Sequence, residues 1–201
     1  KIRLYKNYRE VFGNSVNADN LEECYRKGFI DNLHKLVELE KLNVQMVELF
    51  DLEELAAYLK VDRDDKFDYM GIKILSDKYL LSVREKVYET PQSMWMRVAM
   101  GLSLKEDNPT ERAKQFYEVI SDFRVIPSTP TLFNSGTSHS QCSSCYLLDT
   151  DDSIDGIFGM VHQIARLSKF AGGIGINANK LRGTNGYIRK TAGRSRGIVP
   201  W

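Results

Sequence analysis

Hydrophobic residues recur at helical spacing through the first part of the chain. Across residues 20–60 this period predicts two or three amphipathic helices. Residues 61–67, with the sequence VDRDDKF, form a polar break, and a further helix is predicted over residues 70–79. The pairs Thr90–Pro91 and Asn108–Pro109 each predict another helix start, because the first residue can cap and proline suits the first helical position.

The pattern changes after residue 123. Pro127 and Pro130 forbid a continuing helix, and residues 126–137 are rich in turn-forming residues, which predicts a loop of the kind found in active sites. Residues 145–148 predict a short buried strand. Asp151 or Asp152 is then expected to cap a helix that runs to about residue 168.

A second short strand is predicted in residues 171–177, with the sequence AGGIGIN. Strand, helix and strand in this order form a βαβ unit, so the sheet is expected to be parallel. We therefore predict a mixed α/β fold, with a mainly helical region in residues 1–123 and the opening of an α/β domain in residues 124–201.

Composition and charge restrict the function. The chain has 201 residues, of which 42% are hydrophobic and 27% charged, which is typical of a globular protein. The first ten residues lack the apolar stretch of a signal peptide and the sequence contains no apolar run of membrane-spanning length, so we expect a soluble protein of the cytoplasm. Three cysteines are too few for a disulfide scaffold and favour a reducing compartment.

The C-terminal part of the chain is strongly basic. After Asp155 there is no acidic residue, while eight basic residues follow: Arg166, Lys169, Lys180, Arg182, Arg189, Lys190, Arg194 and Arg196. They are interleaved with glycine, asparagine and threonine in predicted turns and are not arrayed with stacking aromatics. This favours a small phosphorylated ligand over a nucleic acid.

Cys142 and Cys145 form a C-x-x-C pair with several interpretations. They fit a redox pair, although the helix that should follow the first cysteine is replaced by an apolar strand. With His139 they supply three zinc ligands, but a fourth would have to come from a distant part of the chain. A buried structural cysteine is the ordinary alternative for either residue.

Two glycine-containing segments suggest ligand contact. Residues 173–178 match the dinucleotide fingerprint G-x-G-x-x-G/A, but no strand-to-helix context and no downstream acid support it. Residues 183–186 predict a tight turn that folds the basic residues on either side toward each other. Such a loop suits a polyphosphate, and a solvated basic surface loop is the alternative.

Three stretches together resemble the large subunit of class I ribonucleotide reductases. They are STPTLFNSG at 128–136, QCSSC at 141–145 and LSKFAGGIGIN at 167–177, and their order and spacing also match. The resemblance covers roughly two thirds of the chain. It implies a ten-stranded α/β barrel in which ribonucleoside diphosphates are reduced to deoxyribonucleotides by thiyl-radical chemistry.

The resemblance implies a role for each matching residue. Cys145 would be one of two cysteines that reduce the ribose 2′ carbon and become a disulfide. Substrate contacts would come from Thr129, Ser144, Cys145, Ala171, Gly172 and Gly173. A regulatory deoxynucleoside triphosphate or ATP would bind at Asp152, Ser153, Ile154, Arg182, Ile188 and Arg189, assisted by Lys169 and Lys180.

The resemblance also implies partners. The radical would come from a metal-containing small subunit, and reducing equivalents from a thioredoxin or glutaredoxin type protein. A large-subunit homodimer is expected, because the effector site of the family lies at that interface. No cofactor, metal, membrane or nucleic acid is expected to bind this segment directly.

The chain departs from the family in three ways. Cys142 stands where an apolar residue is expected, and no N-terminal ATP-binding domain is evident in the opening residues. The family continues for hundreds of residues beyond this sequence, so we expect either an N-terminal fragment or the first half of a split subunit. A non-catalytic nucleotide-binding module is the alternative function.

Overall fold

The computed structural model describes residues 1–169 and 172–198. The chain divides into two compact units, Lys1–Cys142 and Ser143–Trp201, each described here by itself. The element order is that of a mixed α/β protein, in which a series of helices precedes a short parallel sheet, as the sequence predicts.

The first unit consists mainly of helices. Its elements are α1 (Ile2–Phe12), α2 (Leu21–Glu38), α3 (Gln45–Glu48), α4 (Leu52–Tyr58), the 3-10 helix η1 (Val61–Lys66), α5 (Tyr69–Ile74), the single π-helical turn η2 (Leu75–Tyr79), the strands β1 (Ser82–Val83) and β2 (Lys86–Val87), α6 (Pro91–Ser103), α7 (Pro109–Ser121) and α8 (Thr129–Asn134). The helices predicted from hydrophobic spacing over residues 20–60 are confirmed as α2, α3 and α4.

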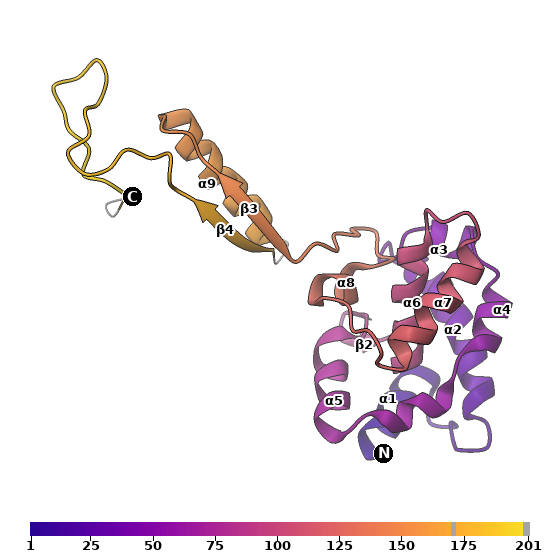
Figure 1. The fold of residues 1–201 in the computed structure, drawn as a ribbon. Coiled ribbons are helices and arrows are strands. Elements are labelled where there is room, and N and C mark those ends of the chain that lie inside the picture. The colour runs from indigo at the N-terminus through magenta and orange to yellow at the C-terminus, as the bar shows by residue number, and fades with distance from the viewer. Residues whose placement is uncertain (170–171, 199–201) are drawn as a thin grey trace. The chain divides into compact units, whose positions relative to one another are not determined.

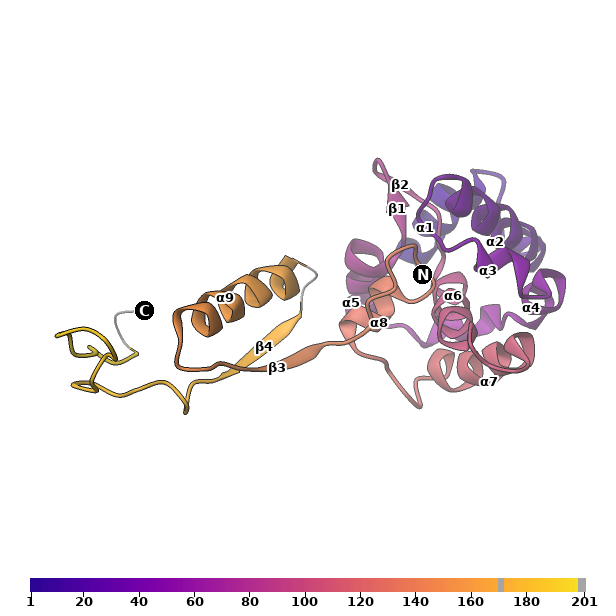
Figure 2. The same cartoon turned by 90° about the horizontal axis from the view of Figure 1, so that it is seen from above.

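Helix α6 lies at the centre of this unit. Every residue from Pro91 to Met100 is buried, including the polar Gln92 and Arg97. A helix that is buried on all sides must be surrounded by other elements. Figures 1 and 2 show α7 beside α6, with α8 at the same end of the unit as α5.

The polar segment 61–67 is not a simple break in the fold. It forms η1, and Asp64 within it is only 2% exposed. The Asp64 carboxylate accepts hydrogen bonds from the Tyr8 hydroxyl at 2.6 Å, from the Gln92 amide at 2.7 Å and from the Tyr25 hydroxyl. Burial raises the pKa of Asp64 to about 6. Asp64 therefore ties together α1, α2 and α6 through one buried carboxylate.

A buried ion pair fixes the end of α8. Arg97 is completely buried, and its Nε donates to Oε1 of Glu89 at 2.6 Å. The same guanidinium donates to the carbonyl oxygens of Leu132 at 3.0 Å and Ser135 at 2.8 Å. These carbonyls lie at the C-terminal end of α8, where a helix lacks internal donors. Arg97 therefore binds α8 to the helical unit.

The first compact unit includes α8 and the residues that follow it up to Cys142. The sequence predicted a boundary between residues 123 and 124, whereas the compact unit extends to Cys142. The predicted loop in residues 126–137 contains α8, with Pro130 in its first turn. A proline is tolerated there because the amide of the first turn has no partner in the helix. The prediction that this whole segment is a loop was therefore wrong.

The second unit contains a parallel βαβ motif, as predicted. Strand β3 (Cys145–Asp149) pairs with β4 (Gly173–Asn177), so that Cys145 lies opposite Gly173 and Asp149 opposite Asn177. Helix α9 (Ile154–Lys169) connects them. Figures 1 and 2 both show α9 lying along the two strands. The N-terminal ends of both strands therefore meet at one edge, where Cys145 lies.

Two details of this motif correct the sequence predictions. Strand β3 was expected to be buried, but Cys145 is exposed and Leu147 is 91% exposed, because two strands and one helix leave much of the sheet uncovered among the described residues. The capping bond of α9 comes from Ser153, whose hydroxyl accepts from the amide of Gly156 at 3.0 Å. The Asp152 carboxylate instead accepts a hydrogen bond from Arg182.

The described residues contain no helix with the length and apolar character needed to cross a lipid bilayer.

Candidate functional site

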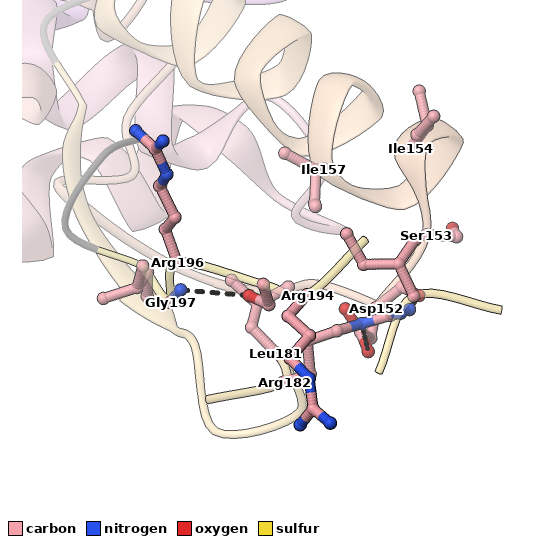
Figure 3. Close-up of a pocket in the computed structure, with 12 residues that line it drawn as sticks. Asp152, Ser153, Ile154, Ile157, Leu181, Arg182, Arg194, Arg196 and Gly197 are labelled. Atoms are coloured by element: carbon pink, nitrogen blue, oxygen red, sulfur yellow. Dashed lines mark hydrogen bonds and ion pairs between the residues drawn. The ribbon is translucent and has the colours of Figure 1, made fainter. Parts of the chain in front are cut away.

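A cavity of about 520 Å³ opens in the second unit. Its lining comes from three segments: residues 152–157 at the start of α9, residues 181–188 after β4, and residues 194–198 near the end of the described chain. Figure 3 shows side chains from these segments. The volume is that of a small-molecule site.

Hydrogen bonds between the two later segments shape the cavity wall. The amide of Gly186 donates to the carbonyl of Gly183 at 3.1 Å, which confirms the predicted tight turn in residues 183–186. Beyond that turn, the amide of Ser195 donates to the carbonyl of Gly186 at 2.8 Å, and the amide of Asn185 donates to the carbonyl of Ser195 at 2.8 Å. These bonds bring residues 194–198 to the cavity.

Asp152 and Arg182 form the main ion pair of the cavity. Nε of Arg182 donates to Oδ2 of Asp152 at 2.7 Å, as the dashed line in Figure 3 indicates. The guanidinium also donates to the carbonyl oxygens of Tyr187 at 2.8 Å and Asp152 at 3.3 Å. Both side chains are about 30% exposed, at 29% for Arg182 and 31% for Asp152. This pair connects the loop after β3 to the loop after β4.

A second ion pair lies near the ends of the two strands. Nζ of Lys180 lies 2.5 Å from Oδ2 of Asp149 and 3.7 Å from Oδ1 of Asp151. A hydrogen bond from Lys180 lowers the pKa of the Asp149 carboxyl, and the same bond raises the pKa of Lys180. The Lys180 ammonium is therefore paired with two carboxylates, and Lys180 does not line the cavity.

The cavity brings together most of the residues expected to bind the effector. Asp152, Ser153, Ile154, Arg182 and Ile188 all line it, although they come from two segments far apart in the sequence. Lys169 and Arg189 are not among the lining residues: Lys169 is the last residue of α9, and Arg189 is exposed.

Sequence reasoning assigned no role in this cavity to Arg194 and Arg196. Both line it, and among the described residues no carboxylate forms an ion pair with either. The signal that could have found them is the absence of acids after Asp155, which leaves these arginines without nearby counter-charges. Figure 3 shows Arg196 on the opposite side of the cavity from Asp152.

Apolar side chains line the same cavity. Ile157 and Leu181 were not predicted as site residues, and they join Ile154, Ile188 and Ile198 there. Cations and aliphatic side chains therefore face one space. That combination suits a ligand with both an anionic part and a flat apolar part.

The residues expected around the substrate form a second group at the N-terminal ends of the two strands. The amide of Gly173 donates to the carbonyl of Ser144 at 2.8 Å, and the hydroxyl of Ser144 donates to Sγ of Cys145 at 3.6 Å. A Cβ atom added to Gly173 would lie 3.2 Å from the carbonyl oxygen of Ser144. One added to Gly172 would lie 2.8 Å from the ring of Tyr146. A side chain at Gly173 would crowd the backbone of Ser144, and one at Gly172 would crowd the Tyr146 ring, so glycine suits both positions near Cys145.

Two of the expected substrate residues lie outside this group. Ala171 falls outside the described residues. Thr129 belongs to the first unit, where it begins α8 and its hydroxyl lies 3.3 Å from the hydroxyl of Tyr79.

The structure bears on the three interpretations of the C-x-x-C motif, namely a redox pair, a zinc site and a buried structural cysteine. Cys24, Cys142 and Cys145 are all free thiols, and Cys145 is exposed, so the interpretation of Cys145 as a buried structural cysteine was wrong for the chain as described. No group of three or more His, Cys, Asp or Glu side chains in residues 1–169 and 172–198 has a metal-binding arrangement. Gly173 and Gly175 lie in β4 and not in a strand-to-helix turn, so the structure does not support a dinucleotide-binding interpretation of residues 173–178.

Comparison with known families separates the same two parts of the chain. Residues 65–140 match the model described as "Ribonucleotide reductase, all-alpha domain". Residues 143–201 match the model described as "Ribonucleotide reductase, barrel domain". The two matches meet near Cys142, where the compact units also divide.

Curated relatives carry the same family name. A ribonucleoside-diphosphate reductase subunit alpha of Chlamydia trachomatis is 44% identical over 194 residues, covering 96% of this chain and 18% of the relative. One from Helicobacter pylori is 43% identical over 155 residues, covering 77% of this chain and 20% of the relative. A large subunit from Dictyostelium discoideum is 37% identical, covering 92% of this chain and 22% of the relative.

The chain thus spans about a fifth of the length of these relatives. Both family matches fall within the ribonucleotide reductase large subunit, and they follow each other in the order of the helical unit and the βαβ unit. The chain belongs to the ribonucleotide reductase large-subunit family, as its all-alpha domain and the start of its barrel domain.

Proposed function

We propose that this chain supplies the first part of the catalytic subunit of a ribonucleoside-diphosphate reductase, and that it binds a regulatory deoxynucleoside triphosphate. The observation that carries the proposal is the cavity of about 520 Å³ that collects Asp152, Ser153, Ile154, Arg182 and Ile188. These five residues are among those that the family resemblance assigns to the effector.

The chemistry of the cavity suits such an effector. Arg182 is engaged by Asp152, which leaves Arg194 and Arg196 as the cations without a described acidic partner. Guanidinium groups bind phosphate oxygens through paired N–H donors. Ile154 and Ile188 offer an apolar surface for a base or sugar. The triphosphate would therefore bind toward the arginines, and the nucleoside toward the start of α9.

The reductive chemistry is assigned to Cys145. Two thiols together supply the two electrons and two protons of the net reaction: a disulfide forms, the C–O bond at the ribose 2′ carbon breaks and is replaced by a C–H bond, and the oxygen leaves as water. Cys145 is a free and exposed thiol beside the close backbone approach of Ser144 and Gly173, which gives a substrate access to its sulfur. The second thiol and the thiyl radical are expected from later parts of the large subunit.

The residues proposed to contact the substrate, besides Cys145, are Thr129, Ser144, Ala171, Gly172 and Gly173. Thr129 and Ser144 bring hydroxyl groups, and backbone amides at the glycines can approach phosphate oxygens closely. A nucleoside diphosphate is the proposed substrate.

The proposal includes the partners that the chemistry needs. A small subunit with a metal centre generates the radical, and a thioredoxin or glutaredoxin type protein reduces the disulfide after each turnover. Two large subunits form a homodimer next to the effector site, and the enzyme acts in the cytoplasm. ATP is a further candidate effector for the same cavity. Lys169 and Arg189 do not line the cavity in the described chain, so their proposed contacts would require the assembled dimer.

A non-catalytic nucleotide-binding module is the second candidate, because the same cavity supports nucleotide binding without any reductase activity. The two candidates differ in turnover: only the reductase forms deoxynucleoside diphosphate when the rest of the large subunit, the small subunit and a dithiol are present.

Equilibrium binding of dTTP to the 201-residue chain tests the effector site directly. We expect saturable binding by the wild-type chain and at least a tenfold weaker affinity in Asp152→Ala, because that change releases Arg182 from its position. Asp65→Ala, which removes an exposed acid of the first unit, serves as the control and should bind like the wild type. Equal affinity in Asp152→Ala and the wild type would contradict the assignment.

A further inference from the structure

Tyr79 lies against the segment that carries Thr129. It is the last residue of η2, the π-helical turn that follows α5, and Thr129 is the first residue of α8. The two hydroxyl oxygens are 3.3 Å apart, although the residues are separated by 50 positions in the sequence. π-Helical turns are uncommon and are frequent at functional sites.

Ring packing fixes the direction of the Tyr79 side chain. Its ring stacks on the ring of Phe133, with centroids 4.7 Å apart and planes 20° from parallel. Phe133 belongs to α8, one turn beyond Thr129. The phenol ring therefore lies along α8. Stacking on Phe133, and not the hydrogen bond between the two hydroxyls, directs the Tyr79 hydroxyl to the Thr129 side chain.

Helix α8 is a rigid support for this contact. The Arg97 guanidinium binds the carbonyls of Leu132 and Ser135 at one end of the helix. The side-chain amide of Asn134 donates to the carbonyl of Gln141 at 2.7 Å. These bonds hold the helix without using any group of Thr129.

The hydroxyl groups near Thr129 can be assigned as donors and acceptors. Thr131 donates its only hydroxyl proton to the carbonyl of Cys142 at 3.1 Å. The hydroxyl of Ser128, 3.1 Å from that of Thr131, must then donate to Thr131. Both protons are therefore used within the segment.

Thr129 is different, because its only described hydroxyl partner is Tyr79. A phenol is a stronger acid than an aliphatic alcohol, so Tyr79 is the better donor of the two. When Tyr79 donates to Thr129, the proton of Thr129 is free to point outward. The Thr129 side chain is exposed, while Tyr79 is half-buried.

We infer that Tyr79 is a positioning residue for substrate binding: it donates a hydrogen bond to the Thr129 hydroxyl and so directs the Thr129 proton toward a phosphate oxygen of a nucleoside diphosphate. The inference rests on the proposed function, in which Thr129 contacts the substrate. It adds a residue from η2, a part of the helical unit that the proposed function does not use.

Tyr79→Phe tests the inference, because phenylalanine keeps the ring that stacks on Phe133 and removes only the hydroxyl. In the assembled reductase we expect KM for a nucleoside diphosphate to rise roughly 3- to 10-fold, the loss typical of one hydrogen bond, with kcat and Tm nearly unchanged. Tyr69→Phe is the matched control. Tyr69 lies on the neighbouring helix α5, is 66% exposed and has no described hydroxyl partner, so its loss should not change KM.

A double-mutant cycle decides whether Tyr79 acts through Thr129. Thr129→Val removes the hydroxyl that contacts substrate, so Tyr79→Phe should add little to KM in that background. If the wild-type enzyme is active, additive effects of the two substitutions on KM, or an unchanged KM in Tyr79→Phe, would overturn the inference about Tyr79. Neither result would contradict the proposed function. An assembled wild-type enzyme that forms no deoxynucleotide would overturn the proposed function, and the inference with it.

Discussion

Nε of Arg182 donates to Oδ2 of Asp152 at 2.7 Å, across an interval of 30 residues in the sequence. The bond joins the loop after β3 to the loop after β4, and both residues line the cavity assigned to the effector. The guanidinium spans Asp152 and the carbonyl of Tyr187, so its planar shape matters as much as its charge.

Arg182→Lys therefore tests the geometry of the cavity. Lysine keeps the positive charge but cannot reach both Asp152 and the Tyr187 carbonyl with a planar group. We expect the affinity for dTTP to fall roughly tenfold, the loss expected for charged hydrogen bonds, while net charge is unchanged. Titration calorimetry measures this directly. An affinity equal to that of the wild type would show that charge alone is sufficient.

Arg194 and Arg196 should bind the phosphates of the effector. Replacing either by glutamine removes a cation that has no described acidic partner, so we expect the affinity for dTTP to fall about 3- to 10-fold for each. The loss should be smaller for deoxythymidine, which has no phosphate. Arg166→Gln on α9 is the matched control, because Arg166 is exposed and does not line the cavity. Equal losses for the nucleotide and the nucleoside would contradict the phosphate assignment.

Asp64 should make stability depend on pH. Its pKa rises from 3.8 to about 6 on folding because the carboxyl is buried, so the folded state binds the proton more tightly than the unfolded state. Stability from this group is therefore fully present below the unfolded pKa and is lost as pH rises through about 6.

Denaturant unfolding of the chain at pH 5 and pH 7 measures this effect. Asp64 should make the free energy of unfolding about 1 kcal/mol greater at pH 5 than at pH 7. Asp64→Asn should lose this difference, whatever its overall stability. Salt-bridged carboxyls such as Asp122 and Glu118 have lowered pKa values and act in the opposite direction only at lower pH. An equal pH dependence in wild type and Asp64→Asn would contradict the account.

The buried pair of Arg97 and Glu89 should be essential to the first unit. Arg97→Met leaves the Glu89 carboxylate buried without its main partner, and the carbonyls of Leu132 and Ser135 lose their donor. We expect a loss of about 3–5 kcal/mol in the free energy of unfolding. The double variant Arg97→Met, Glu89→Leu should regain part of this loss. A double variant less stable than Arg97→Met would contradict the pairing.

The sequence predicted the elements whose signals are local. Helix starts at Pro91 and Pro109, the parallel βαβ motif and the turn in residues 183–186 all follow from residue type and spacing. Asn108 even makes the expected capping bond, accepting from the amide of Glu111. Thr90 does not cap with its side chain, because its hydroxyl contacts Ser93 at 2.7 Å.

The features that were missed depend on contacts between distant residues. Nothing local in VDRDDKF shows that Asp64 is buried, since its donors come from Tyr8, Tyr25 and Gln92. Likewise α8 is supported by Arg97, which precedes it by more than 30 positions. Five residues that line the cavity, namely Asp152, Ser153, Ile154, Arg182 and Ile188, were expected as effector contacts from motif resemblance alone. Arg194 and Arg196 carry no motif, and only the fold of residues 183–198 brings them to the cavity.

We propose that Cys145 is one of the two thiols that reduce the ribonucleotide. The most direct test is multiple-turnover formation of deoxynucleoside diphosphate with a dithiol reductant, measured in the assembled reductase carrying Cys145→Ser. Cys142→Ser is the matched control, because it removes the neighbouring thiol of the same motif. We predict that Cys145→Ser abolishes turnover while dTTP binding persists, and that Cys142→Ser remains active. Near-normal turnover by Cys145→Ser would contradict the account.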